Sequence, residues 1–351
     1  MGAFTTAKAV ALALAVVAST GWLKGTGSRA DEETQKPPPK IYVVGFETCG
    51  EKPQVSIPFF YYGYQYSGWV ATLWDGGEPK RLSDGKTDTK AEFIYVSDGD
   101  GDVYIAGIKR EEVMLWKNGE PVALEDPYQL HVNSLFVSGG DVYVTGTEYS
   151  RTGCIVYDHR VGALWKNGAK TTFGKNTSAE DVCASGKTVK VVGNKHGSPV
   201  VWVNGKATPL LNKGGWSSAK SIRMAAGKTY VAGVDNDKPM LWVDGKRQTL
   251  PCGGKRGGAD TVTVFGNDVY VTGEIDSKHV LWKNGVLQDL GRPDLPDSKT
   301  HAIFVKDGLP YVLRTTGGNG APTTILVTQG DRVYNLAETT NSVIVKGLFV
   351  E

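Results

Sequence analysis

Three short apolar blocks recur in a fixed order along the chain. One has the form Val-Tyr-Val-x-Gly or a close variant, as at 103–107, 142–146 and 269–273. A second joins an apolar residue and a tryptophan to two polar residues and a glycine, as in Leu115–Gly119. A third, such as Ser-Leu-Phe-Val at 134–137, precedes the first. Short alternating runs rich in Val, Tyr and Trp and bounded by glycine predict β-strands, and no part of the repeat has the spacing of a helix.

The residues between the blocks predict hairpin turns. Asn-Gly or Asp-Gly follows the tryptophan in five copies, and both residues readily take the positive φ of a type I′ turn. The pairs are Asn118-Gly119, Asn167-Gly168, Asn204-Gly205, Asp244-Gly245 and Asn284-Gly285. A short stretch that ends in an apolar residue, such as Leu124, follows and predicts an outer strand. The repeat therefore contains four antiparallel strands, named A to D in chain order.

The tryptophan block marks seven copies of this repeat. Its tryptophans lie at positions 74, 116, 165, 202, 242 and 282, and Val327 takes the place of tryptophan in the last copy. A four-stranded repeat of about 40 residues is typical of a β-propeller blade, because only neighbouring blades can bury both faces of such a sheet. The first copy begins at its second strand, 41–45, and the chain ends with a first strand, 342–350. The sequence therefore predicts an all-β fold: a seven-bladed β-propeller of four-stranded antiparallel blades, closed by a C-terminal strand that pairs with the N-terminal blade.

Residues 1–30 have the pattern of a signal peptide. The apolar run Ala9–Ala18 follows a lysine, and Ser28-Arg29-Ala30 offers small residues for a cleavage site. The run is shorter than the roughly 20 apolar residues that span a bilayer. We therefore expect a secreted or periplasmic protein with no transmembrane span after cleavage; an uncleaved anchor is the alternative.

Composition indicates what the segment before the repeats is and which class of partner is not expected. Residues 31–40 are charged and proline-rich, which predicts an exposed linker before the propeller at 41–351. The chain carries 39 Lys and Arg against 37 Asp and Glu, a formal charge of +2. Because nucleic-acid binders usually carry a strongly basic face, we expect no nucleic-acid partner.

The four cysteines are Cys49, Cys154, Cys183 and Cys252. An exported chain permits disulfides, but their pairing does not follow from the sequence. Cys183 lies in a predicted A strand and is interpreted as a small buried thiol.

The repeated blocks, over about 41–350, resemble those of secreted bacterial β-propeller-repeat proteins of uncharacterised function. The resemblance implies the propeller architecture and carries no activity. The characteristic motifs of WD40, kelch and sialidase propellers are missing from their usual places.

Strand order places the irregular loops on one face. The B–C and D–A loops share this face, called the loop face, whereas the short A–B and C–D turns share the other. Function is expected on the loop face, because binding residues concentrate on irregular loops held by a rigid frame. The largest insertion, 46–68, with its flanking residue supplies the candidate ligand-binding residues Tyr61, Tyr62, Tyr64, Tyr66 and Trp69. Such rings suit stacking on sugars or contact with a protein; the alternative is a hairpin whose rings pack on their own blade.

Further candidate ligand-binding residues lie on the same face. They are Tyr149, Arg151, Tyr157 and His159 in the third blade, His196 in the fourth blade and Trp216 in the loop that follows it. For the segment 147–161, a solvated loop is the alternative. The six tryptophans of the repeat are interpreted as core residues rather than as a ligand array.

Asp98, Asp100 and Asp102 alternate with glycines and resemble a calcium-binding loop. The segment lacks the glycine at the sixth position and the glutamate at the twelfth position of an EF-hand loop. A calcium site and a plain hairpin turn are therefore alternatives, and no other cofactor is expected.

No catalytic motif is evident. The histidines show no HExxH spacing, and neither G-x-S-x-G nor a P-loop occurs. We therefore expect a monomeric binding or interaction module for a carbohydrate or protein partner. The alternative is a hydrolase or lyase with its site at the loop-face mouth of the central channel, where side chains from several blades could converge.

Overall fold

The computed structural model describes residues 38–48, 68–127, 131–152, 156–210, 217–290, 298–318 and 321–351. The chain divides into two units, Met1–Pro38 and Pro39–Glu351, and the second is the repeat domain. The regular secondary structure of its described residues consists of β-strands only, β1 to β28. In that part of the chain, no helix is long and apolar enough to span a membrane. The predicted signal peptide lies outside the described residues, so export stays a prediction.

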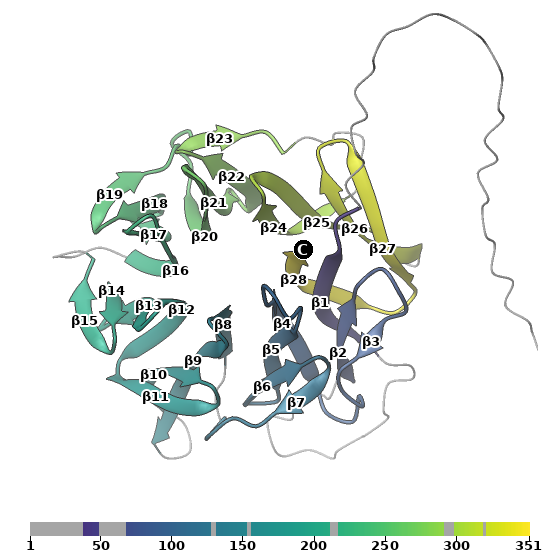
Figure 1. Ribbon diagram of the computed structural model, residues 1–351, viewed down its shortest axis with the longest axis horizontal. Helices are drawn as coiled ribbons and strands as arrows, with labels where there is room; N and C mark the ends of the chain where they lie inside the picture. The colour runs from purple at the N-terminus through teal and green to yellow at the C-terminus, as the bar shows by residue number, and fades with distance from the viewer. Residues whose placement is uncertain are drawn as a thin grey trace, which may run out of the picture. The chain divides into compact units, whose positions relative to one another are not determined.

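Seven four-stranded antiparallel sheets form the blades of a ring (Figure 1). Blade 1 consists of β28 (Val343–Val350), β1 (Ile41–Thr48), β2 (Trp69–Trp74) and β3 (Lys80–Arg81). Blade 2 consists of β4 (Thr89–Val96), β5 (Val103–Lys109), β6 (Glu112–Lys117) and β7 (Glu120–Val122). Blade 3 consists of β8 (His131–Ser138), β9 (Asp141–Thr152), β10 (Val156–Lys166) and β11 (Ala169–Lys175). Blade 4 consists of β12 (Thr177–Ser185), β13 (Thr188–Lys195), β14 (Ser198–Val203) and β15 (Lys206–Pro209).

The other three blades repeat this order. Blade 5 consists of β16 (Ser217–Ala225), β17 (Lys228–Asp235), β18 (Lys238–Val243) and β19 (Lys246–Thr249). Blade 6 consists of β20 (Gly257–Phe265), β21 (Asp268–Ile275), β22 (Lys278–Lys283) and β23 (Val286–Gln288). Blade 7 consists of β24 (Lys299–Lys306), β25 (Leu309–Gly318), β26 (Ala321–Gln329) and β27 (Arg332–Thr339). The strand named first in each blade is strand A and lies nearest the centre of the ring, which confirms the predicted seven-bladed propeller.

The last strand of the chain closes the ring. β28 pairs antiparallel with β1, from Ile41 opposite Val350 to Glu47 opposite Val343. The backbone N–H of Glu351 donates to the carbonyl oxygen of Lys40 at 2.9 Å. The predicted completion of the N-terminal blade by the C-terminal strand is therefore confirmed.

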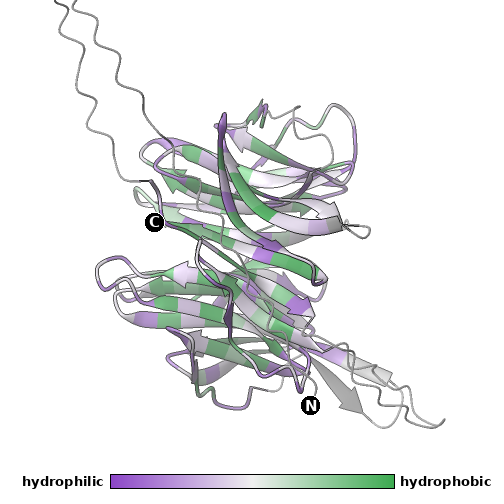
Figure 2. Cartoon of the chain, turned by 90° about the vertical axis from the view of Figure 1, so that its right-hand side faces the viewer, coloured by the Kyte–Doolittle hydropathy of each residue, from purple (hydrophilic) through white to green (hydrophobic). Residues whose placement is uncertain are grey.

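The repeated tryptophans form the core between blades. Four of them have no exposed surface, namely Trp74, Trp165, Trp242 and Trp282. Two of these indoles form a hydrogen bond with the preceding blade. The Nε1–H of Trp165 donates to the carbonyl oxygen of Glu125 at 2.7 Å, and that of Trp282 donates to Pro251 at 2.9 Å. Figure 2 shows the matching alternation of hydrophobic and hydrophilic positions along the strands. The interpretation of these tryptophans as core is correct.

The polar residues of the repeat form a clamp at the A–B and C–D turns. In blade 3, Asp141 contacts Lys166 Nζ at 2.7 Å and Asn167 Nδ2 at 2.6 Å, while Asn167 Oδ1 accepts from the N–H of Val142 at 2.8 Å. The Lys166 ammonium also lies 5.6 Å from the ring centroid of Tyr143. Blades 2 and 6 repeat the same contacts. The recurrence of Lys-Asn-Gly and Asp-Val-Tyr in the sequence is therefore structural.

Each innermost strand contains one extra residue. In β12, Ala179 pairs with Gly193 and Asp181 pairs with Val192, so that Glu180 has no partner in β13. We call these extra residues the bulge residues. In blades 1 to 7 they are Lys346, Glu92, Asn133, Glu180, Lys220, Asp260 and His301. A β-bulge re-aims side chains, and here it presents a polar residue from every blade.

The bulge also explains the glycine that ends the Val-Tyr-Val-x-Gly block. At Gly193, a Cβ atom would overlap the carbonyl oxygen of Ser178, which the bulge pushes toward it. Arg314 takes this position in blade 7 and is almost buried. Its guanidinium contacts the hydroxyl of Thr300 at 3.2 Å.

Candidate functional site

The B–C segment of blade 3 is a long hairpin rather than an irregular loop. β9 and β10 contain 12 and 11 residues, whereas the corresponding β13 and β14 contain 8 and 6. Tyr157 lies opposite Arg151, and His159 lies opposite Ser150. Four predicted ligand-binding residues, Tyr149, Arg151, Tyr157 and His159, therefore share one two-stranded projection on the loop face.

The aromatic insertion of blade 1 lies mostly outside the described residues. This applies to Tyr61, Tyr62, Tyr64 and Tyr66, whose role stays a prediction. Trp69 opens β2 and stands edge-on to Phe46, with ring centroids 4.9 Å apart. The Trp69 ring therefore packs on its own blade, which favours the alternative interpretation for this residue.

The structure brings only some of the predicted residues to neighbouring blades. His196 lies exposed in the tight turn between β13 and β14, with a φ of 50°. Blade 4, which carries it, follows blade 3 and its long hairpin, whereas blade 2 separates Trp69 from that hairpin. Trp216 lies outside the described residues.

The three aspartates of the predicted calcium loop form the turn between β4 and β5. Asp100 accepts a hydrogen bond from Ser97 Oγ and one from the N–H of Asp102. Asp102 pairs with Lys117 Nζ at 2.5 Å, which lowers the pKa of its carboxyl. Asp98 is exposed. Among the described residues, no group of three or more His, Cys, Asp and Glu is arranged to hold a metal ion. These contacts favour the hairpin turn, and the calcium site stays a prediction.

The bulge residues interact across blade boundaries. Lys220 Nζ lies 2.7 Å from Asp260 Oδ1 in the next blade. Asn133 Nδ2 donates to the carbonyl oxygen of Ala179 at 2.7 Å. Desolvation raises the pKa of Glu92, and the nearby ammonium of Lys346 opposes that shift. Because strand A starts at the loop face and the bulge lies in its first half, these contacts line the channel toward that face.

His301, the bulge residue of blade 7, is a neutral member of the set of bulge residues. Its Nε2 lies 2.8 Å from Thr315 Oγ1. Burial, together with the positive charge of Lys299 and the nearby His279 and Lys346, lowers the pKa of its imidazole to about 4.

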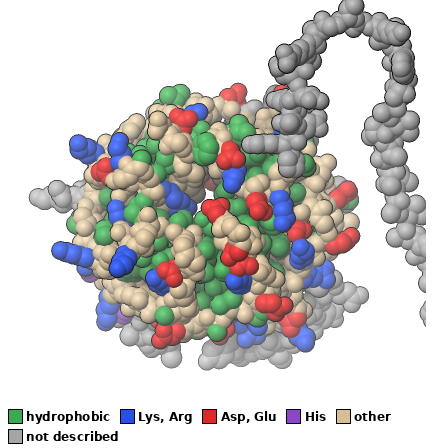
Figure 3. Space-filling view, viewed as in Figure 1, with side chains coloured by type: hydrophobic (Ala, Val, Ile, Leu, Met, Phe, Trp, Pro, Cys, Tyr) green, Lys and Arg blue, Asp and Glu red, His purple; other side chains and the backbone are tan. Residues whose placement is uncertain are grey.

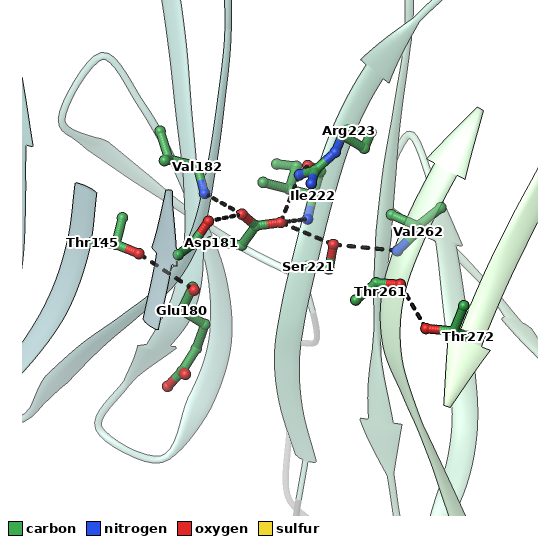
Figure 4. A network of polar contacts seen from close by, with 11 residues as sticks. Thr145, Glu180, Asp181, Val182, Ser221, Ile222, Arg223, Thr261, Val262 and Thr272 are labelled. Carbon is green, nitrogen blue, oxygen red and sulfur yellow. Dashed lines mark hydrogen bonds and ion pairs between the residues drawn. The ribbon is translucent and has the colours of Figure 1, made fainter. Parts of the chain in front are cut away.

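Asp181, which follows the bulge residue Glu180, joins three blades (Figure 4). Its five donors are Ser134 Oγ, Val182 N, Ser221 Oγ, Ile222 N and Arg223 Nη1, at 2.5, 2.8, 2.9, 2.9 and 2.8 Å. Only 5% of Asp181 is exposed. A buried carboxylate is stable only when it is paired and hydrogen-bonded, and these donors meet that requirement.

The side chain of Arg223 extends from blade 5 toward blade 3. Its guanidinium carbon lies 5.5 Å from the ring centroid of Phe136 in blade 3. Burial alone would lower the pKa of Arg223, but the carboxylate of Asp181 raises it above its ordinary value. The side chain retains 32% of its surface exposed, so a permanent positive charge faces the channel.

Aromatic rings line the other side of the channel at the same strand position. Tyr95 lies 5.7 Å from Phe136 and 5.5 Å from Phe349, and Phe304 lies 5.1 Å from Phe349, all between ring centroids. Blades 7, 1, 2 and 3 thus contribute an aromatic arc. At the equivalent position, blades 5 and 6 carry the polar residues Arg223 and Thr263, and blade 4 carries the buried Cys183. The channel therefore has one apolar and one polar side.

Cys183 is buried with a free thiol, as predicted. Burial raises the pKa of this thiol to about 12, so it is not a nucleophile at neutral pH. Cys252 is also buried and free, whereas Cys49 and Cys154 lie outside the described residues.

This channel network escaped the sequence analysis. Two signals were present: a charged residue, Arg223, in the middle of an inner strand, and the recurrence of alanine, a charged residue and a polar residue. The latter occurs at 179–181, 219–221 and 259–261. As a chemical arrangement, a fixed guanidinium beside aromatic rings suits the binding of planar or anionic groups.

No family model matches the chain, and no curated protein matches it. Among solved structures, it is similar to a Mycobacterium tuberculosis puromycin-hydrolyzing peptidase, with 12% identity, a TM-score of 0.50, and coverage of 78% of this chain and 50% of that one. It is also similar to Pyrococcus horikoshii acylaminoacyl peptidase, with 10% identity, a TM-score of 0.51, and coverage of 77% and 48%. The chain spans about half the length of these peptidases. At such identities, the similarity shows the fold alone.

Proposed function

We propose that the chain is an exported β-propeller that acts as a binding or interaction module for a glycan or protein partner. The observation that carries this proposal is the long β9–β10 hairpin on the loop face. It joins Tyr149, Tyr157, Arg151 and His159 on one projection of blade 3. Aromatic and Arg side chains of this kind dominate binding interfaces and sugar-stacking sites.

A shortened hairpin tests the proposal. Replacing residues 149–160 by Asn-Gly joins Glu148 to Val161, which already lie opposite each other, through a two-residue turn. The purified protein and this variant are compared on a glycan array and in affinity capture from the medium of its host. The matched control, Lys195→Gln, changes an exposed residue in the neighbouring blade of the same face and keeps the hairpin.

We expect a retained ligand with the unaltered protein and the control, and loss of that ligand with the shortened hairpin. A ligand that survives shortening would contradict the role of the hairpin. No retained ligand together with turnover of a substrate would overturn the binding proposal in favour of the alternative, a hydrolase or lyase at the channel mouth.

A further inference from the structure

The face opposite the hairpin carries the A–B and C–D turns, and we call it the turn face. A–B turns lie at a smaller radius than C–D turns, because strands A and B are the inner pair of each blade. Figures 1 and 3 view this face, on which the last strand of the chain ends. Its exposed residues differ systematically from blade to blade.

Blades 4 and 5 present lysines at both radii. Lys187 and Lys228 lie on the A–B turns, and Lys206 and Lys246 follow the C–D turns. All four are exposed, and none forms an ion pair with any residue that the structure describes. Lys and Arg side chains are visible over these two blades at the left of Figure 3. This is the basic sector.

Blades 1 and 2 present carboxylates at the same two radii. Asp98 and Asp100 lie on the A–B turn of blade 2, and Glu120 follows its C–D turn. In blade 1, Glu351 lies where β28 gives way to β1, and Glu78 lies in the connection from β2 to β3. All five are exposed. In blade 1 the exposed cations Lys40, Lys80 and Arg81 lie beside the carboxylates, so net negative charge is concentrated in blade 2. This is the acidic sector.

Blades 6 and 7 present apolar side chains. Phe265 and Leu309 lie at the A–B turns and are 47% and 49% exposed. Val286 and Val333 lie beside the C–D turns and are 62% and 40% exposed. Among the described residues, blades 6 and 7 hold most of the exposed large apolar side chains. This is the apolar sector.

These three sectors are related by a simple symmetry. A two-fold axis in the plane of the turn face and through blade 3 exchanges blade 4 with blade 2, blade 5 with blade 1 and blade 6 with blade 7. It also keeps every turn at its own radius. Lys187 then meets Asp98 and Asp100, and Lys206 meets Glu120. Where blade 5 meets blade 1, Lys228 and Lys246 face carboxylates that have lysines beside them, Glu351 with Lys40 and Glu78 with Lys80. Phe265 meets Leu309, and Val286 meets Val333.

We propose that the turn face is the interface of a homodimer, in which two copies meet face to face about this axis. An isologous interface must be self-complementary, and the basic blade 4 against the acidic blade 2 and the apolar blade 6 against blade 7 meet that condition. Blade 3, which the axis crosses, presents the small turns Gly139-Gly140 and Asn167-Gly168, and its charged residues Asp141 and Lys166 are paired with each other, so they add no net charge there. An anionic membrane is a weaker fit, because the acidic sector would face the lipid charge. The dimer replaces the sequence-based expectation of a monomer, and it leaves the loop faces of both copies free.

Charge exchange tests this geometry with the full chain. Sedimentation equilibrium over a range of protein concentrations is run on the unaltered protein and on two variants. The first variant, Lys187→Glu with Lys206→Glu, makes blade 4 acidic; the second, Asp98→Lys with Glu120→Lys, makes blade 2 basic. Each should weaken dimerisation at least about 100-fold, because like charges then face each other. A 1:1 mixture of the two should form a heterodimer, and a chain with all four changes should dimerise again.

The control variant is Lys109→Glu with Lys195→Glu, which makes the same change of charge on the loop face and should leave the dimer intact. Far-ultraviolet circular dichroism confirms that each variant is folded. A monomer at every concentration, or a dimer that neither variant weakens, would overturn the proposal. So would variants that neither pair with each other nor recover in the four-fold exchange. Binding of the monomeric unaltered protein to vesicles of anionic phospholipid would assign the face to a membrane and would equally overturn it.

Discussion

Arg223 of blade 5 and Asp181 of blade 4 form an ion pair of 2.8 Å across a blade boundary inside the channel. The same carboxylate accepts a hydrogen bond from Ser134 of blade 3. One aspartate therefore holds the inner strands of three consecutive blades in register.

Replacing Asp181 by Asn should strongly destabilise the propeller. The change leaves the guanidinium of Arg223 without its counter-charge in a largely desolvated position, so we expect a loss of about 3–5 kcal/mol in the free energy of unfolding. Urea denaturation followed by tryptophan fluorescence measures this loss. The control is Glu180→Gln, one residue away; Figure 4 shows that carboxylate pointing away from the network, and the expected change is within about 0.5 kcal/mol. Equal effects of the two substitutions would contradict the role of Asp181.

The bulge makes a second, steric prediction. Gly193→Ala should destabilise the protein by about 1–3 kcal/mol, because the new methyl group overlaps the carbonyl oxygen of Ser178 and forces the backbone to move. Gly258→Ala is the matched control, since the nearest atoms to its Cβ lie at ordinary contact distance, 3.8 Å or more. Thermal unfolding of both variants gives the comparison, and an unchanged melting temperature for Gly193→Ala would refute the clash.

Pairing of β28 with β1, which closes the ring, should make a large contribution to the free energy of unfolding. Deleting residues 342–351 leaves β1 as an open edge and removes the buried side chains of Val345, Leu348 and Val350. At about 1.5–3 kcal/mol for each buried aliphatic side chain, the loss is roughly 5 kcal/mol or more. Calorimetry should show a much lower melting temperature, and a synthetic peptide of residues 342–351 should restore part of it. A deletion that melts like the intact protein would show that β28 does not close the ring.

His301 should make stability depend on pH. Its folded-state pKa of about 4 lies below the ordinary value of 6.5, so the unfolded chain takes up a proton first as the pH falls. The contribution of His301 to the free energy of unfolding is therefore complete above pH 6.5 and is lost between pH 6.5 and about 4. Its upper limit is about 3 kcal/mol. In His301→Gln this part of the pH dependence should disappear from urea denaturation curves. Identical profiles for wild type and His301→Gln would exclude the effect.

The sequence was sufficient to predict the architecture because its signals are local. Asn167-Gly168 specifies a turn by backbone conformation, and Trp165 marks a mid-strand core position whose environment every blade repeats. Because the pattern is repeated, the architecture can be predicted even where one copy lacks a signal. In the last copy, for example, Val327 replaces the tryptophan.

The channel could not be predicted in the same way, because its contacts join residues about 40 positions apart in different blades. Asp181 and Ser221 look like ordinary strand residues until closure of the ring sets their distance at 2.9 Å. The bulge is hidden for a related reason: an extra Glu180 breaks the two-residue alternation, and the sequence alone does not say on which side of the break the register resumes. The B–C segment of blade 3 was misjudged because its polar residues suit an exposed hairpin as well as a loop.

Closure by β28 has a consequence for the synthesis of the protein. Tyr42 of blade 1 and Glu351 contact each other although 309 positions separate them. Blade 1 is therefore the first sheet to emerge from the ribosome and the last to be completed. Until blade 7 and β28 have been made, β1 offers an unpaired strand edge, which favours association between incomplete chains.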